Sequence, residues 1–103
     1  MKYFPIFLTG SRLNALIIGG GDVAARKIEL LLKTTKQITV MSAQLNSSVQ
    51  RLVNSHQLNW LEHNYQAGLL APYNLVIAAT DDQQVNYAIY QEVDAQNILI
   101  NVV

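Results

Sequence analysis

The stretch "LIIGGGDVAARKIELLL", residues 16–32, places three consecutive glycines between an apolar run and a leucine-rich run with helical spacing. Residues 19–24 fit the pattern G-x-G-x-x-G/A at the junction of a strand and a helix. We expect Gly19 to form the tight turn, Gly21 to let the backbone approach a pyrophosphate, and Ala24 to let helix and strand pack closely. Free N–H groups at the start of the helix, near Gly20 and Val23, would add to the phosphate site.

The alternative is a glycine-rich bend that binds nothing. Asp22 places a carboxylate at the start of the helix, which favours the helix but repels a nearby phosphate. We therefore assign Asp22 a backbone contact. Three glycines in a row cost more backbone entropy than a plain bend requires, and this favours the binding interpretation.

Length and composition narrow the possible functions. The 103 residues suffice for one small domain, 1–103, and half of them are apolar. Seven basic and seven acidic residues leave no net charge, which argues against nucleic acid and against an anionic membrane surface. The chain has no cysteine, its first apolar run is broken by Pro5, and no apolar run approaches the roughly 20 residues that span a bilayer. We expect a soluble, cytoplasmic protein.

Strand-like and helix-like segments alternate along the chain. The apolar runs of strand length are 13–18, 37–41, 58–61, 74–79 and 97–103, and most of the segments between them have helical spacing. This alternation predicts an α/β fold of the Rossmann-like, doubly wound type, with a mainly parallel sheet of five to six strands and helices on both faces. Residues 1–12 are expected to form an edge strand, and residues 62–73 to hold one short helical turn.

Polar residues mark the starts of the later helices. We expect Ser42 to cap the second helix. Thr80 is expected to cap the third helix, with Gln83 in the capping-box position.

The end of the second strand lacks the acid that usually holds the adenosine ribose about 20 residues after the glycine turn. No Asp or Glu occurs between Glu29 and Glu62. Ser42, Gln44 or backbone groups of Ala43 would have to contact the ribose instead. Because the stretch also offers no arginine for a 2′-phosphate, NAD is favoured over NADP.

Other candidate contacts follow the fourth and fifth strands, because ligands bind outside the carboxyl ends of parallel strands. Thr80 offers a hydroxyl and Asp81 a carboxylate, although helix capping explains both residues equally well. Asn101 interrupts the last apolar strand and could contact a ligand or end the sheet. The two histidines lack metal-ligand spacing, so we predict no metal site. Trp60 and the tyrosines at 65, 73, 87 and 90 are interpreted as packing residues.

In these residues and motifs the chain resembles the NAD-dependent precorrin-2 dehydrogenase domain that forms the N-terminal part of siroheme synthases. The similar blocks are "YFPIFLTGSRLNALIIGGGDVAARKIELLL", "NLVIAATDDQQVN" and "ILINVV", in the same order. The resemblance implies oxidation of the tetrapyrrole precorrin-2 to sirohydrochlorin with NAD, in siroheme and thus porphyrin-type biosynthesis. It also implies ferrochelatase activity in many members, and a homodimer in the full-length family.

Carried over by position, the resemblance implies dinucleotide contacts at Gly21–Val23 and at Ala43 and Gln44. It places Thr80 and Asp81 beside the nicotinamide and the tetrapyrrole. In the family an aspartate that acts as general base follows "NVV" directly, whereas this sequence ends at Val103, before the dimerisation and helical segments. Asp81 is the remaining carboxylate that we nominate as catalytic.

Other functions remain as alternatives. A regulatory module could bind NAD without turning it over, and NADH formation would distinguish it from a dehydrogenase. A methyltransferase usually needs an acid at the end of its second strand, and none is present here. A pure interaction domain leaves the position of the glycine turn unexplained.

Overall fold

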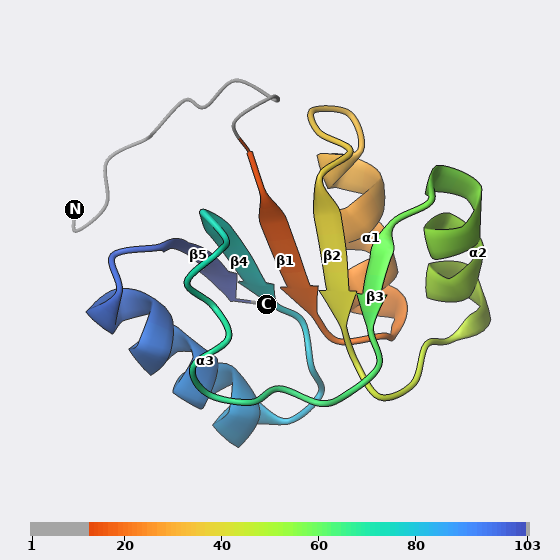
Figure 1. The fold of residues 1–103 in the computed structure, drawn as a ribbon. Coiled ribbons are helices and arrows are strands. Elements are labelled where there is room, and N and C mark those ends of the chain that lie inside the picture. Colours follow the sequence, from red (N-terminus) through yellow and green to blue (C-terminus); the bar gives the residue numbers. More distant parts are fainter. Residues whose placement is uncertain (1–12, 103) are drawn as a thin grey trace.

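The computed structural model describes residues 13–102. The edge strand expected over residues 1–12 lies outside this part. The elements, in chain order, are β1 (Ala15–Ile18), α1 (Asp22–Leu31), β2 (Ile38–Met41), α2 (Ser47–His56), β3 (Asn59–Leu61), β4 (Leu75–Ala78), α3 (Gln83–Ala95) and β5 (Leu99–Val102) (Figure 1). No helix between residues 13 and 102 combines the length and the apolarity that a bilayer crossing needs.

The strands form one sheet in the order β3-β2-β1-β4-β5, and every neighbouring pair is parallel. The first three strands extend the sheet in one direction from β1. The chain then crosses to the other side of β1, where β4 and β5 follow. A crevice forms at the carboxyl ends of β1 and β4, where the direction reverses. The predicted fold is confirmed, and the five described strands agree with the predicted count.

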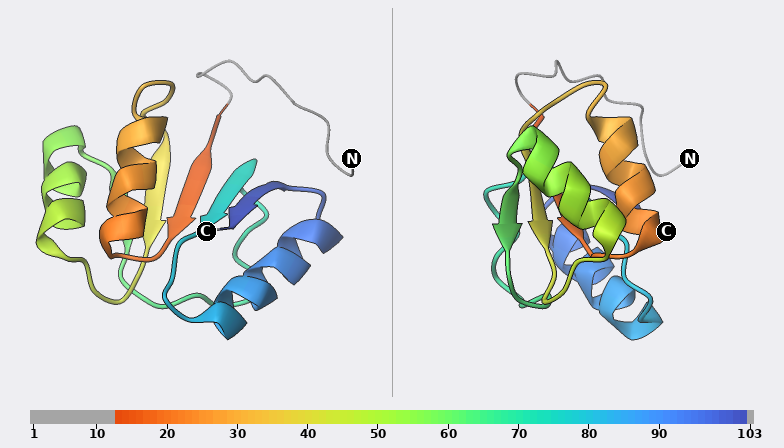
Figure 2. Two further views of the ribbon diagram at one scale, coloured as in Figure 1. Left: turned by 180° about the vertical axis from the view of Figure 1, so that it is seen from behind. Right: turned by 90° about the vertical axis from the view of Figure 1, so that its right-hand side faces the viewer.

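Both faces of the sheet are buried, because successive side chains of a strand point to opposite faces. Ala15 and Ile17 pack with α1 and α2 in one apolar cluster, whereas Leu16 and Ile18 pack with α3 in another. All four residues of β1 are at most 1% exposed. Seen from behind, α1 lies over β1 and β2 with α2 next to it (Figure 2). The expected covering of both faces by helices is therefore confirmed.

The cap of α2 differs from the prediction. Asn46 precedes the helix, and its side-chain oxygen accepts a hydrogen bond from the Val49 N–H at 2.9 Å. Ser42 lies too far before the first helical residue to cap α2, because a capping side chain must reach the second or third N–H of its helix. The Ser42 hydroxyl donates to the Gln44 carbonyl at 2.7 Å instead, and so closes the turn that follows β2.

The cap of α3 also differs from the prediction. The Asp82 carboxylate accepts from the Gln84 N–H at 2.9 Å and from the Val85 N–H at 3.3 Å. Gln83 is the first helical residue, so it cannot occupy the capping-box position. Thr80 lies two residues before the cap and is bonded elsewhere, as described below.

Residues 62–73 contain turns but no helix, contrary to the prediction. This segment is fastened to α3 by Glu92, whose carboxylate accepts from the Tyr65 hydroxyl and, at 3.0 Å, from the Gly68 N–H. Leu70 anchors it further with a fully buried side chain. The tertiary contacts hold residues 62–73 beside α3, on the path from the end of β3 back to the start of β4, without a helical turn.

Candidate functional site

A cleft of about 950 Å³ lies at the carboxyl ends of the strands. Its walls are the glycine turn after β1, the turn after β2, the segment after β3 and the turn after β4. The described residues that line it are Ile18, Gly19, Gly20, Gly21, Asp22, Val23, Met41, Ser42, Ala43, Gln44, Leu45, Asn46, Asn64, Tyr65, Ala79, Thr80, Asp81, Asp82 and Val85.

The three glycines serve different purposes in the turn. Gly19 has a φ of +133°, and a Cβ there would lie 2.3 Å from the Ala79 carbonyl oxygen. A Cβ on Gly20 would lie 2.1 Å from the Gln44 carbonyl oxygen. At Gly21 a Cβ would have no neighbour within 4 Å. Gly19 and Gly20 are thus required by the fold, whereas Gly21 leaves open space beside the cleft.

The start of α1 presents unused hydrogen-bond donors to the cleft. The N–H groups of Gly21, Asp22 and Val23 donate to no described residue, and the first helical bond runs from the Ala25 N–H to the Gly21 carbonyl at 3.0 Å. Such N–H groups, together with the positive end of the helix dipole, form an anion site. The open space at Gly21 and the free donors fit the pyrophosphate of a dinucleotide.

Asn46 joins the glycine turn to α2. Its side-chain N–H donates to the Asp22 carboxylate at 2.8 Å, and its backbone N–H donates to the Gly20 carbonyl at 2.8 Å. The same side chain caps α2 through its oxygen. The Asp22 carboxylate is thereby held by Asn46, and a contact of the Asp22 backbone with a ligand stays a prediction.

The turn after β2 forms the wall next to the glycine turn. Ser42, Ala43 and Gln44 all line the cleft, where they were expected to contact the ribose. Trp60 of β3 donates its indole N–H to the Ser42 carbonyl at 2.8 Å, and this bond fixes the start of the turn. The Ser42 hydroxyl already donates to Gln44, so it can still accept a hydrogen bond from a ribose hydroxyl.

The turn after β4 forms the opposite wall. Thr80 lines the cleft and bonds to Asn86 of α3, and Asp81 is exposed beside it. The Asp81 carboxylate accepts no hydrogen bond from any described residue. A carboxylate in that state is available to accept a proton from a bound molecule.

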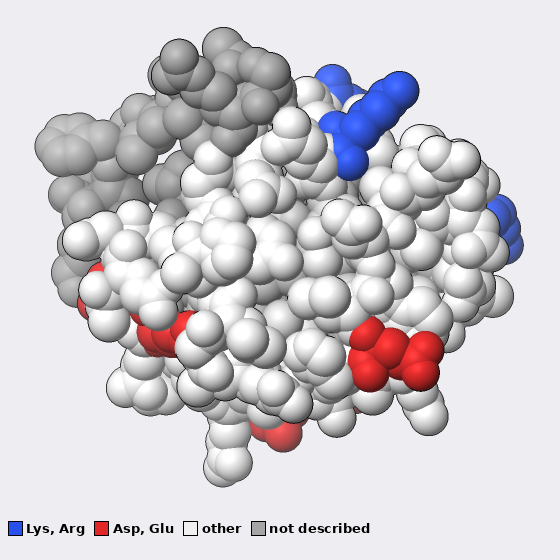
Figure 3. Space-filling view, viewed as in Figure 1, with Lys and Arg blue, Asp and Glu red and all other residues white. Residues whose placement is uncertain are grey.

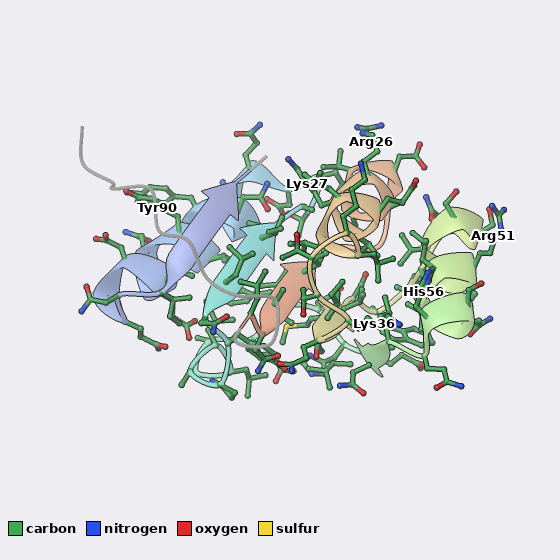
Figure 4. All side chains as sticks on the ribbon, turned by 90° about the horizontal axis from the view of Figure 1, so that it is seen from above. Arg26, Lys27, Lys36, Arg51, His56 and Tyr90 are labelled. Carbon is green, nitrogen blue, oxygen red and sulfur yellow. The ribbon has the colours of Figure 1, made fainter. Side chains whose placement is uncertain are left out.

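The charged side chains that line the cleft are acidic. Asp22, Asp81 and Asp82 line it, and no Lys, Arg or His is among its described residues. In the view of Figure 3, acidic side chains gather toward the edge where the strands end, and basic ones toward the opposite edge and the side. Arg26 and Arg51 lie on the outer sides of α1 and α2 (Figure 4). Backbone N–H groups, not basic side chains, are therefore the groups available for a phosphate.

Tyr65 lines the cleft from the segment after β3. Partial burial raises the pKa of its hydroxyl above the ordinary value of 10.0, and the hydrogen bond and the charge of Glu92 raise it further. The phenol therefore stays protonated at neutral pH and keeps donating to Glu92.

The predicted site residues come together in this cleft. Gly19–Val23, Ser42–Gln44, Thr80 and Asp81 all line it; their contact with a dinucleotide stays a prediction. Asn101 lies in β5 opposite Ile77, and its side chain is outside the described part. Among residues 13–102, no three His, Cys, Asp or Glu side chains gather where they could hold a metal ion.

Sequence reasoning missed several lining residues. Asn46 could have been identified as an N-cap, because it is a capping residue type and precedes an amphipathic run that includes Leu52, six residues later. Tyr65 was interpreted as packing, and nothing in its local sequence indicated that Glu92, 27 residues away, would hold it at the cleft. Asn64 reaches the cleft through the crossing of the chain from β3 to β4, whereas Asp82 and Val85 line it from the start of α3.

Comparison with known proteins agrees with this geometry. Siroheme synthase from Pseudoalteromonas atlantica is 48% identical over all 103 residues, and siroheme synthase from Actinobacillus pleuropneumoniae serotype 7 is 41% identical. The chain spans 22% and 21% of these relatives, respectively. Among solved structures, SirC, a precorrin-2 dehydrogenase, superimposes with a TM-score of 0.82 at 24% identity, over 97% of this chain and 50% of that one, and this likeness shows the fold.

The family match covers nearly the whole sequence. Residues 6–103 match the family NAD_binding_7, described as "Putative NAD(P)-binding". The glycine turn, the free N–H groups of α1 and the crevice beside β1 are the features that such binding requires. The chain belongs to this NAD(P)-binding family.

Proposed function

We propose that this chain is the NAD-binding portion of an enzyme that oxidises precorrin-2 to sirohydrochlorin in siroheme biosynthesis. The observation that carries the proposal is the cleft at the glycine turn, with open space at Gly21 and unused N–H groups at the start of α1. The siroheme synthases that are up to 48% identical over the entire chain support the choice of reaction.

The proposal assigns binding roles to the two walls next to α1. The N–H groups of Gly21, Asp22 and Val23 hold the pyrophosphate. Ser42, Ala43 and Gln44 contact the adenosine ribose, through the Ser42 hydroxyl oxygen and backbone groups. The cleft has no described cation for a 2′-phosphate and has three carboxylates at its rim, which favours NAD over NADP.

The wall after β4 then borders the reacting centre. NAD supplies a hydride acceptor when it is bound. Dehydrogenation also releases a proton from the substrate. Asp81 is the carboxylate of the cleft that is exposed and accepts no hydrogen bond from a described residue. We propose Asp81 as the proton acceptor. Asp81→Asn should lower kcat and leave the Kd for NAD unchanged; unchanged turnover would dispose of this role.

A turnover assay tests the proposed reaction. Protein that carries this chain is mixed with NAD and precorrin-2, and NADH absorbance is followed beside the spectrum of the tetrapyrrole. NADH should form together with sirohydrochlorin, and Gly21→Ala should slow both signals at subsaturating NAD because it fills part of the space left for the cofactor.

The same assay addresses the alternative, an NAD-sensing module. Saturable NAD binding without NADH formation, in protein that contains the segments following residue 103 in the relatives, would favour the sensing module and contradict the dehydrogenase. Homodimerisation and a cytoplasmic location stay predictions; sedimentation measures the first and fractionation of cells the second.

A further inference from the structure

Asn86 lies on α3, one turn inside the helix, and is 6% exposed. It does not line the cleft, yet both polar ends of its side chain bond to one residue that does. Its side-chain N–H donates to the Thr80 carbonyl at 3.0 Å. Its side-chain oxygen accepts from the Thr80 hydroxyl at 2.6 Å and from the Thr80 N–H at 3.3 Å.

These bonds use both donors of Thr80, its N–H and its hydroxyl. The hydroxyl has a single hydrogen, and Asn86 receives it because the Asn86 side-chain oxygen is 2.6 Å away, whereas the Asp82 carbonyl oxygen is 3.0 Å away. The hydroxyl oxygen also accepts from the Asp82 N–H at 3.2 Å. Thr80 therefore has no donor left for a ligand, although its hydroxyl lies at the cleft and is the group that the sequence offers for binding.

The position of Thr80 matters because its backbone lies against the glycine turn. A Cβ on Gly19 would be 2.3 Å from the Ala79 carbonyl oxygen and 3.2 Å from the Thr80 nitrogen. The turn after β4 and the glycine turn are thus in direct backbone contact. A displacement of Thr80 must move one wall of the cleft relative to the other, because there is no free space between the two close-packed backbones.

We infer that Asn86 is a positioning residue for the dinucleotide cleft: it fixes Thr80 against Gly19, and the Thr80 hydroxyl serves this bond instead of the ligand. The inference rests on the proposed binding of NAD. A buried side-chain amide that lies outside the cleft thus sets the distance between the glycine turn and the turn after β4.

The first measurement needs no ligand. In purified protein, hydrogen exchange of the Thr80 amide is compared between the wild type, Asn86→Ala and the control Asn74→Ala. Asn74 is matched to Asn86 because its side-chain oxygen also accepts a backbone N–H, that of Asn14 at 2.8 Å, at the opposite end of β4. Faster exchange at Thr80 in Asn86→Ala only is expected; unchanged exchange there would overturn the inference.

The second measurement is a double-mutant cycle on the Kd for NAD. Asn86→Ala should raise the Kd by about fivefold to tenfold, as expected for the loss of hydrogen bonds that hold a binding wall. Asn74→Ala should leave it unchanged. Thr80→Val should raise the Kd in the wild type and cause no further loss in Asn86→Ala. The same loss in both backgrounds would show that the hydroxyl contacts the ligand directly, and would overturn the inference.

If Asn86→Ala does not fold, Asn86→Leu takes its place, because it keeps the approximate size and removes both the acceptor of the Thr80 N–H and the donor to the Thr80 carbonyl. It should raise the Kd and speed Thr80 exchange. Absence of NAD binding to the wild type would refute the proposed function, whereas the exchange measurement would still decide whether Asn86 fixes Thr80.

Discussion

Alanine substitutions at two glycines of the same turn should have opposite effects. Gly19 has a φ of +133° and lies against the Ala79 carbonyl, whereas Gly21 has a φ of −104° and open space around its missing Cβ. Gly19→Ala should destabilise the fold. Gly21→Ala should leave the fold intact and weaken NAD binding.

The magnitudes follow from the geometry. An alanine forced to the backbone conformation of Gly19 costs about 1–3 kcal/mol, and relief of the clash between its Cβ and a backbone oxygen only 2.3 Å away costs about 1–3 kcal/mol more. The sum is a large part of the roughly 5–15 kcal/mol that stabilises a small domain. At Gly21, alanine should instead stabilise by about 0.4–1 kcal/mol, because the unfolded chain loses freedom.

Urea unfolding measures the stability, and calorimetric titration with NAD measures the affinity of the folded variants. Gly21→Ala should raise the Kd roughly tenfold or more, a loss of at least about 1.4 kcal/mol. Gly68→Ala is the control for backbone strain alone, because Gly68 has a φ of +90° but no neighbour near its missing Cβ. Wild-type affinity in Gly21→Ala, or wild-type stability in Gly19→Ala, would refute the reasoning.

Three further predictions concern the surroundings of the turn. Asn46→Ala should cost about 1 kcal/mol of stability through the lost cap and should also weaken NAD binding, because it releases Asp22; equal affinity would contradict the second effect. Raising the salt concentration from about 0.05 M to about 0.2 M should leave the Kd for NAD unchanged or lower, since the described cleft has only acidic charges; marked weakening would show a basic side chain at the ligand. Because the folded state raises the pKa of Tyr65, its contribution to stability is complete below pH 10.0 and is lost as the pH rises through the raised pKa. Alkaline titration followed by tyrosinate absorbance should therefore lose its latest step in Tyr65→Phe, and a wild-type curve would contradict the account.

The features that sequence could predict are those set by local chemistry. The segments that form β1, β2 and β4 are almost continuously apolar, as expected for strands of a parallel sheet whose two faces are covered. The glycine turn was predictable because a positive φ at Gly19 and a backbone contact at Gly20 exclude side chains. The cleft then follows from the topology, since ligands bind where the strand order reverses.

The features that sequence could not predict depend on the path of the chain between elements. Ser42 and Asn46 are both good caps, and only the length of the turn after β2 decides between them. Thr80 and Asp82 present the same ambiguity before α3. The contact of Tyr65 with the cleft requires a tertiary bond that the local sequence does not encode.

The most direct test of the account is a titration of isotope-labelled protein with NAD, followed by backbone amide shifts in NMR spectra, with NADP as the control. If the cleft binds NAD, saturable shifts are expected that centre on Gly19–Val23 and on Ala43 and Gln44, together with weaker binding of NADP. Absence of shifts at millimolar NAD would contradict the account, because the glycine turn would then only shape the fold.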